Sequence, residues 1–148
     1  MNLASLITPV NFNNTHWAVV VVKPAQRSVR LFDSIPNESR RASVEAFFRP
    51  FLARRAQRER SQGHAVDTQL AHESAWTVTL PANTLRNSFP LQDDGHSCGI
   101  ITCRVIAALL KSREPTFKNC DMQAQYLTPD EARATRFDIL KAIQSHQT

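Results

Sequence analysis

The sequence predicts an α+β fold in which a β-hairpin forms part of a mixed sheet and packs against helices. Residues 17–22 read Trp-Ala-Val-Val-Val-Val, a β-branched run typical of a strand that is buried on both faces. Residues 28–33 alternate in polarity and predict a second strand, joined to the first by a turn at 23–27. The apolar run at 100–110 predicts a helix that packs on the sheet.

The length of 148 residues suits one domain, and no linker divides the chain, so we expect a single domain over residues 1–148. The apolar runs are too short to span a membrane, and no signal peptide precedes them. We therefore expect an intracellular protein without membrane contact, located in the nucleus or cytoplasm, and leave its oligomeric state open. The three cysteines lack Cys-x-x-Cys spacing, which argues against a disulfide scaffold and against a zinc site.

The net charge of +5 comes mainly from arginine between residues 40 and 60. A basic surface attracts nucleic acid or an acidic protein, although charge along a helix is usually just solvated. Because neither aromatic interleaving nor a nucleic-acid motif accompanies the charge, nucleic-acid binding is not the expected function.

The predicted hairpin places two polar residues near each other. A turn centred on Pro24 and Ala25 would put His16 directly opposite Asp33. Residues opposed across two strands have Cβ atoms about 4.5–5.5 Å apart, so an imidazole and a carboxylate would be within hydrogen-bond reach. The alternative is that both are ordinary surface residues at the ends of a hairpin.

A helix is predicted after Asn37 or Ser39, either of which can cap it, and Pro50 is expected to kink or break it. Its predicted apolar face consists of Val44, Phe47, Phe48, Phe51 and Leu52. The polar segment 61–75 is predicted to be a mobile loop and an insertion.

Towards the end of the chain, residues 76–80 alternate like a strand, and residues 111–125 are predicted to be irregular. Thr128-Pro129-Asp130-Glu131 has the pattern of a capping box with proline at the first helical position. A final helix should run from there to about Ser145. We expect Phe137, Leu140 and Ile143 on its core-facing side.

The stretch 92–99, Gln-Asp-Asp-Gly-His-Ser-Cys-Gly, places Cys98 where the helix 100–110 is about to begin. The free backbone N–H groups and positive dipole at a helix start favour a thiolate over a thiol. Gly95 and Gly99 would permit a sharply bent backbone beside such a nucleophile. The alternative is a buried structural cysteine, which is the role expected of Cys103 within the helix.

His16, Asp33, Gln92 and Cys98 together supply the parts of a thiol nucleophile's site. Such a site needs a base for the thiol proton, a group that orients the base, and a donor for the oxyanion formed when a carbonyl is attacked. His16-Trp17, Asp33-Ser34 and Gln92-x5-Cys98-Gly99 occur in that order. This pattern resembles the catalytic core of the ubiquitin-like-protein proteases, the SUMO-deconjugating family related to adenovirus protease.

The resemblance implies a papain-like cysteine protease fold of the adenain type, and a role for each matched residue. Cys98 would be the nucleophile, His16 the general base and acid, Asp33 the residue that orients the imidazole, and Gln92 an oxyanion donor. Trp17 and Gly99 would contact the substrate. The implied reaction is hydrolysis after the Gly-Gly tail of a SUMO-type modifier through a thioester, with that modifier or its conjugates as partner and without metal or organic cofactor.

The chain departs from the family pattern at three places. Ser97 stands where the family often has aspartate, 59 residues separate Asp33 from Gln92, and only 15 residues precede His16, where the family has a helical lobe that helps to bind the modifier. Two alternatives therefore stay open. One is a truncated, catalytically impaired domain that serves as a binding module, and the other is an acetyltransferase of the same fold, although those typically use glutamate as the acid.

Overall fold

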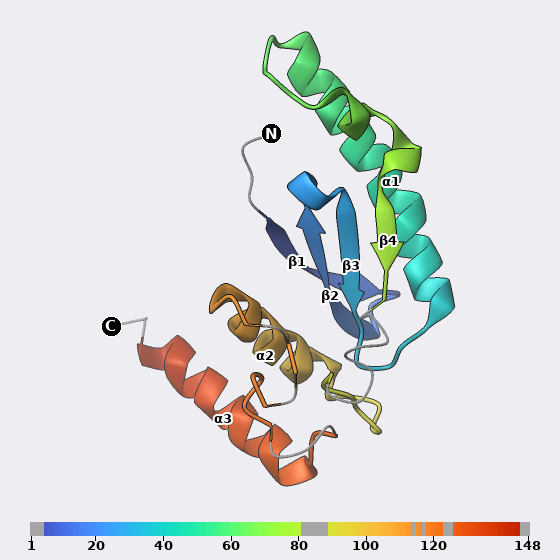
Figure 1. Ribbon diagram of the computed structural model, residues 1–148. Coiled ribbons are helices and arrows are strands. Elements are labelled where there is room, and N and C mark those ends of the chain that lie inside the picture. The colour runs from blue at the N-terminus through green and yellow to red at the C-terminus, as the bar shows by residue number, and fades with distance from the viewer. Residues whose placement is uncertain (1–4, 81–88, 114, 117, 123–125, 146–148) are drawn as a thin grey trace.

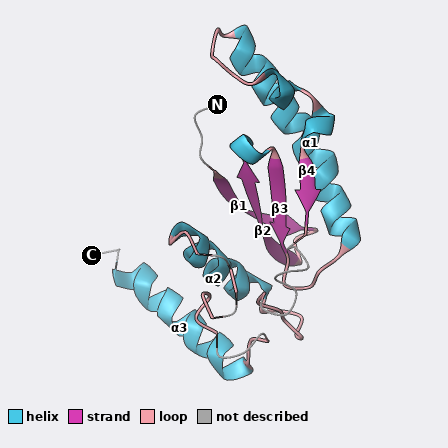
Figure 2. Cartoon of the chain, viewed as in Figure 1, coloured by secondary structure: helices cyan, strands magenta, loops and turns pink. Residues whose placement is uncertain are grey.

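The computed structural model describes residues 5–80, 89–113, 115, 116, 118–122 and 126–145. A four-stranded sheet stands at its centre, with the strands in the order β1-β2-β3-β4 (Figure 1, Figure 2). The strands are β1 (Leu6–Phe12), β2 (His16–Lys23), β3 (Ser28–Phe32) and β4 (Thr77–Thr79). The first three are antiparallel, whereas β4 runs parallel to β3, so the sheet is mixed as predicted.

Helices cover both faces of the sheet (Figure 1). The helix α1 (Glu38–Ser61) lies on one side, and α2 (Cys98–Leu110) with α3 (Pro129–Ser145) lies on the other. Successive side chains of a strand point to opposite faces, so Val20 packs in the α1 layer while Val19 and Val21 pack in the α2 layer. The strand β2 is therefore buried on both faces, as its valine run predicts.

The strand β1 was not predicted. It pairs with all of β2 except Lys23, from Leu6 opposite Val22 to Phe12 opposite His16. Asn13 and Asn14, with φ of 53° and 59°, form the turn between the two strands. The strand is an edge of the sheet, where Pro9 is tolerated because one side needs no ladder partner. A half-exposed edge strand carries little periodicity, which explains why the sequence did not indicate it.

The predicted register between β2 and β3 is wrong by two residues. A short helical turn at Pro24–Gln26 followed by Arg27 in the left-handed region, with φ of 49°, lengthens the connection. Lys23 therefore pairs with Ser28 rather than with Gln26, and the ladder ends where Val19 pairs with Phe32. An even shift keeps every side chain on its predicted face, so the two-layer packing is unaffected.

The helix α1 begins at Glu38, where the Asn37 side chain accepts a hydrogen bond from the Arg40 backbone N–H at 3.1 Å. It continues to Ser61 through Pro50, so the predicted break is wrong. Its buried face is also narrower than predicted. The i, i+4 row of Val44, Phe48 and Leu52 is buried, whereas Phe47 and Phe51 lie one position to the side and are 62% and 43% exposed.

The segment between α1 and β4 contains two short helical turns, at Thr68–Ala71 and Glu73–Ala75. Leu70 and Ala71 are buried there, and the buried Trp76 indole N–H donates to the Leu70 carbonyl oxygen at 3.1 Å. The predicted loop is thus anchored to the core. That it is an insertion stays a prediction.

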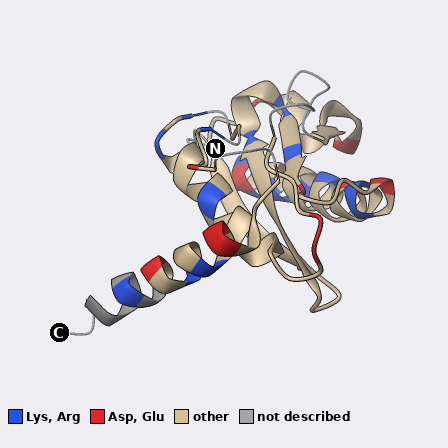
Figure 3. Cartoon of the chain, turned by 90° about the horizontal axis from the view of Figure 1, so that it is seen from below, with Lys and Arg blue, Asp and Glu red and all other residues tan. Residues whose placement is uncertain are grey.

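The capping box before α3 is confirmed, because Thr128 N donates to Glu131 Oε2 at 3.0 Å and Glu131 N donates back to Thr128 Oγ1 at 3.3 Å. The helix carries both acidic and basic residues and extends away from the rest of the chain (Figure 3). Phe137 is 62% exposed, so its predicted place in the core is wrong. The side chains of Leu140 and Ile143 lie outside the described residues. Within the part of the chain that the structure describes, no helix is long and apolar enough to cross a membrane.

Candidate active site

His16 and Asp33 meet where β2 begins and β3 has ended. His16 Nε2 lies 2.7 Å from Asp33 Oδ1, and the two residues are 8% and 0% exposed. The predicted hydrogen-bond contact therefore forms, although the residues are not direct cross-strand partners. Because Nε2 faces the carboxylate, Nδ1 is the ring nitrogen that remains to exchange a proton with a thiol.

The Asp33 carboxylate is held from three directions. Oδ1 also accepts from the Ile35 backbone N–H at 2.9 Å, and Oδ2 accepts from Arg40 Nε at 2.7 Å. The Arg40 guanidinium also donates to the Ile35 carbonyl oxygen and lies over the Phe12 ring. A buried carboxylate is stable as an anion when it is paired and hydrogen-bonded, and these contacts supply both conditions. Sequence reasoning missed Arg40, because only the fold turns the first turn of α1 back towards Asp33.

Gln92 is buried and held at two ends. Its backbone N–H donates to the Ser34 carbonyl oxygen at 3.2 Å, and Ser34 Oγ donates to its side-chain Oε1 at 2.7 Å. Gln92 Nε2 donates to the Asp94 carbonyl oxygen at 2.7 Å. A carbonyl oxygen can only accept, so this contact fixes which end of the amide is the nitrogen. The second hydrogen of Nε2 is then the group that could stabilise an oxyanion.

Asp94 organises the loop that leads into Cys98. Its Oδ1 accepts from the backbone N–H groups of His96 at 3.0 Å and Ser97 at 2.8 Å, and its Oδ2 accepts from Ser97 Oγ. Burial alone would raise the pKa of Asp94, but the bonds from the Ser97 hydroxyl and from the two N–H groups outweigh it, and the pKa is lowered. Asp94 therefore holds the residue before the cysteine in place.

The glycines of this loop have a smaller role than predicted. A Cβ on Gly95 would meet nothing within 4 Å, and neither Gly95 nor Gly99 has a left-handed backbone. A Cβ on Gly99 would lie 3.9 Å from Trp17 Cδ1, which is ordinary contact. That distance places the beginning of β2 against the first turn of α2.

Cys98 is the first residue of α2 and is 5% exposed. It lines a cavity of about 700 Å³ together with Trp17, Gly99 and His96. Trp17 is 43% exposed, so this edge of the cavity is open to a ligand. The two residues predicted to contact substrate, Trp17 and Gly99, thus lie beside the predicted nucleophile.

Cys103 lies in the same cavity and is exposed, so the prediction that it belongs to the core is wrong. Five residues along a helix turn the side chain by about 140°, away from the direction of Cys98 and of the sheet. Cys120, which sequence reasoning left without a place, is buried. Burial raises the pKa of Cys120 to about 12; the Asp121 charge adds to the rise and Arg104 opposes it.

The hydrogen bonds join most of the predicted site. His16 bonds to Asp33, the adjacent Ser34 bonds to Gln92, and the loop from Gln92 to Ser97 ends at Cys98. Among the described residues, no group of three or more His, Cys, Asp or Glu side chains is placed to hold a metal ion.

The model of the Ulp1 protease family, C-terminal catalytic domain, matches residues 2–142, which is nearly the whole chain. The chain belongs to the Ulp1 protease family. No curated protein matches the chain in sequence.

Solved structures of Ulp1-family proteins share the fold. The C-terminal Ulp1 protease domain in complex with Smt3, the yeast ortholog of SUMO, matches with a TM-score of 0.52 and 17% identity, covering 80% of this chain and 47% of that chain. The Chaetomium thermophilum Ulp1-like SUMO protease catalytic domain matches with a TM-score of 0.53 and 19% identity, covering 91% and 44%. The chain thus spans less than half the length of these Ulp1-family chains. The predicted α+β fold of the SUMO-protease type is confirmed.

Proposed function

We propose that this chain is the catalytic core of a cysteine protease that hydrolyses the peptide or isopeptide bond after the Gly-Gly tail of a SUMO-type modifier. Membership of the Ulp1 family supports the class of enzyme. The observation that carries the proposal is a series of contacts: His16 bonds to Asp33, and the adjacent Ser34 bonds to Gln92. The loop that begins at Gln92 leads to Cys98, the first residue of α2. The modifier and its conjugates are the proposed partners.

In the proposed reaction, His16 Nδ1 takes the Cys98 thiol proton, and Cys98 Sγ attacks the carbonyl carbon of the terminal glycine. The tetrahedral oxyanion is stabilised by Gln92 Nε2–H and the Cys98 backbone N–H. When the bond to the amine breaks, His16 returns its proton to the leaving nitrogen, and a thioester remains on Cys98. Water then attacks the thioester, gives a proton to His16, and releases the glycine carboxylate while the thiol is restored.

The supporting contacts fit this sequence of steps. Asp33 accepts from Nε2, which fixes the imidazole tautomer and stabilises the imidazolium formed in the first step. Backbone and Ser34 contacts hold the Gln92 amide before substrate arrives, so little reorganisation is needed when charge develops. Trp17 and Gly99 line the cavity beside Cys98 and are the proposed contacts of the Gly-Gly tail.

A SUMO probe with a C-terminal thiol-reactive group tests the proposal. The purified chain is incubated with this probe, with a ubiquitin probe and with a probe of another ubiquitin-like modifier. We expect a covalent adduct with the SUMO probe that disappears in Cys98→Ala. Cys103→Ala is the matched control, because Cys103 lies exposed in the same cavity, and this variant should keep the adduct.

Three outcomes would contradict the proposal or its assignment of the nucleophile. If no probe reacts while iodoacetamide still modifies Cys98 in the folded chain, the domain is a binding module. If the chain instead transfers an acetyl group from acetyl-coenzyme A to Cys98 and then to an acceptor lysine, it is an acetyltransferase. A probe adduct that survives Cys98→Ala would assign the nucleophile to another thiol.

A further inference from the structure

Two phenylalanine rings lie exposed beside each other on α1. Phe47 is 62% and Phe51 is 43% exposed, and their rings stack with centroids 5.8 Å apart and planes inclined by 12°. The buried Phe48 ring packs edge-on against both. Exposed apolar patches mark interaction surfaces, and aromatic residues are enriched there. Because α1 covers the face of the sheet opposite α2 (Figure 1), this patch lies apart from the proposed active site.

A cavity of about 280 Å³ opens beside Phe47, between α1 and β1. Thr8, Val10 and Phe12 of β1 line it, and all three are half-buried, so they still present surface to a ligand. None of the described residues that line the cavity is charged. Pro9 points to the other face of the sheet and lines the cavity beside the proposed nucleophile. An apolar side chain would fit beside Phe47 without obstructing the active site.

Two arginines continue the same side of α1. Arg54 and Arg58 follow Phe47 by seven and eleven residues, and Phe51 follows it by four, which is the spacing of one helix face. Both arginines are exposed. Within the part of the chain that the structure describes, neither guanidinium has an acidic partner. The ion pairs of α1 use other arginines of the helix, namely Arg40, Arg41, Arg49 and Arg55.

We propose that this surface, made of Phe47, Phe51, Arg54, Arg58 and the adjacent cavity, docks an acidic amphipathic helix of a partner protein. Apolar side chains of that helix would cover the two rings and fill the cavity, while its carboxylates would pair with the two arginines. A helix fits because its side chains recur at the same spacing of three and four residues along the contact. The net charge of +5 would steer an acidic partner towards the chain.

Charge complementarity favours this partner over two other occupants. A second copy of the chain would bring more arginines but no free carboxylate from α1, because Glu38, Glu45 and Glu59 are already paired with arginines of the helix. A nucleic acid would find no cation in the cavity beside Phe47, and the rings of Phe47 and Phe51 stack on each other rather than standing apart to receive bases.

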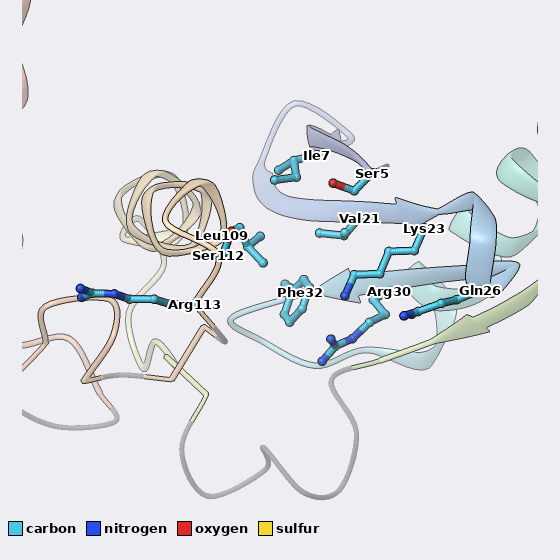
Figure 4. A pocket seen from close by; sticks show the side chains of 10 residues that line it. All are labelled: Ser5, Ile7, Val21, Lys23, Gln26, Arg30, Phe32, Leu109, Ser112 and Arg113. Carbon is cyan, nitrogen blue, oxygen red and sulfur yellow. The ribbon is translucent and has the colours of Figure 1, made fainter. Parts of the chain in front are cut away.

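The cavity between the sheet and the C-terminal end of α2, of about 390 Å³, offers less surface to a partner (Figure 4). Val21 and Phe32 line it and are each only 2% exposed. The Arg30 guanidinium carbon already lies 4.8 Å from the centroid of the Phe32 ring. The exposed rings and arginines of α1 are therefore the better docking surface.

Fluorescence anisotropy with three labelled, alanine-based helical peptides tests this surface without measuring catalysis. The first peptide has two leucines four residues apart, with glutamates at helical spacing on both flanks, so it complements the surface in either direction. The second replaces the leucines with serine, and the third replaces the glutamates with glutamine. Only the first should bind well. Phe47→Ala and Arg54→Glu should each weaken its binding about tenfold.

The helix α3 offers a matched control for each variant. Phe137 is 62% exposed, like Phe47, and Arg133 is exposed, like Arg54, so Phe137→Ala and Arg133→Glu make the same changes elsewhere. Each should change the affinity less than about twofold. Circular dichroism melts of each variant check that it folds.

Four outcomes would overturn the proposal. The first is an absence of binding by the leucine and glutamate peptide. The second is an equal loss in a variant and its α3 control, since binding would then follow net charge or general hydrophobicity. The third is an oligothymidine that binds as well with the same dependence on Arg54, which would indicate a nucleic acid. The fourth is a dimer in analytical ultracentrifugation that Phe47→Ala disrupts, which would indicate a second copy of the chain.

Discussion

Arg40 Nε lies 2.7 Å from Asp33 Oδ2, the carboxylate oxygen that does not face His16. The acid of the proposed triad is thus clamped between the imidazole and a guanidinium that is itself anchored on the Ile35 carbonyl oxygen. Through this contact, α1 is connected to the proposed catalytic histidine by two successive hydrogen bonds. In the proposed reaction Arg40 is a positioning residue, because it contacts the histidine only through Asp33.

Replacing Arg40 with alanine should lower kcat between about tenfold and a hundredfold with little change in KM, because Asp33 loses the contact that fixes its second oxygen. Steady-state cleavage of a fluorogenic SUMO conjugate measures both constants. Lysine at this position should restore part of the rate, and added guanidinium should rescue Arg40→Ala. Arg41→Ala is the control, since Arg41 pairs with Glu38 and Glu45 outside the site and should leave kcat unchanged. Equal losses in the two variants would show that Arg40 has only a structural role.

Ser34 should matter through the orientation of Gln92. Ser34→Ala removes the 2.7 Å hydrogen bond to Gln92 Oε1, so the amide can rotate away from the oxyanion, and kcat should fall about tenfold. Gln92→Ala, which removes the donor itself, should reduce kcat about 10²–10³-fold. Ser43→Ala removes a comparable hydroxyl bond on the surface of α1 and should have no effect on kcat. A Gln92→Ala variant with the wild-type kcat would exclude Gln92 as the oxyanion donor.

The stability contributed by Asp94 should depend on pH. Its pKa is lowered in the folded chain, so the stabilisation is present above the ordinary aspartate pKa and is lost as the pH falls through the folded value. Asp94→Asn keeps an oxygen that can accept from the backbone N–H groups but loses the negative charge and the acceptor of the Ser97 hydroxyl, so it should reduce the unfolding free energy at pH 7 by about 1 kcal/mol. Asp93→Asn, at the exposed neighbouring position, should have little effect.

Thermal unfolding at pH 7 and at pH 3 checks this prediction. The difference between Asp94→Asn and the wild-type chain should shrink at pH 3, because this pH lies below the ordinary aspartate pKa and the unfolded chain then takes up a proton that the folded chain binds less readily. A difference that is the same at both pH values would mean that Asp94 stabilises the loop without its charge.

Cys120 and Cys103 should differ in their reactivity towards iodoacetamide. With a pKa of about 12, Cys120 holds roughly one part in ten thousand of its thiol as thiolate at pH 8, so iodoacetamide should modify it only after unfolding. Exposed Cys103 should react in the folded chain. Peptide mass spectrometry of native and denatured samples measures each site. Fast modification of Cys120 in the native sample would contradict the burial that raises its pKa.

Local patterns predicted the elements whose signal is local. The valine run correctly predicted that β2 is buried between two layers. The capping box correctly predicted where α3 begins. The register of β2 with β3 depends on a turn in which Arg27 adopts a left-handed backbone, which the identity of an arginine does not indicate. The strand β1 forms because it pairs with the side of β2 that β3 leaves unpaired. Phe47 was misplaced because the direction of the sheet, and not the apolar run, decides which side of α1 is buried.

The candidate site also has residues that local patterns predict and residues whose role depends on the fold. His16, Asp33, Gln92 and Cys98 could be predicted from residue type, order and family resemblance. The residues that hold them in place could not. Arg40 reaches Asp33 only because the chain bends at Ser34 and Ile35 between β3 and α1. Asp94 acts on Ser97 only because the loop folds over its carboxylate.

The backbone contact of 3.2 Å between Gln92 N and Ser34 O closes a long excursion of the chain. The chain leaves the site after Ser34, forms α1 and β4, and returns to the site at Gln92. A flexible surface loop within this excursion can double its length for about 0.6 kcal/mol of closure entropy while the two ends of the excursion stay fixed. Its length can therefore vary during evolution without displacing Asp33 relative to Gln92, which makes the long separation between the two residues in this sequence compatible with an intact site.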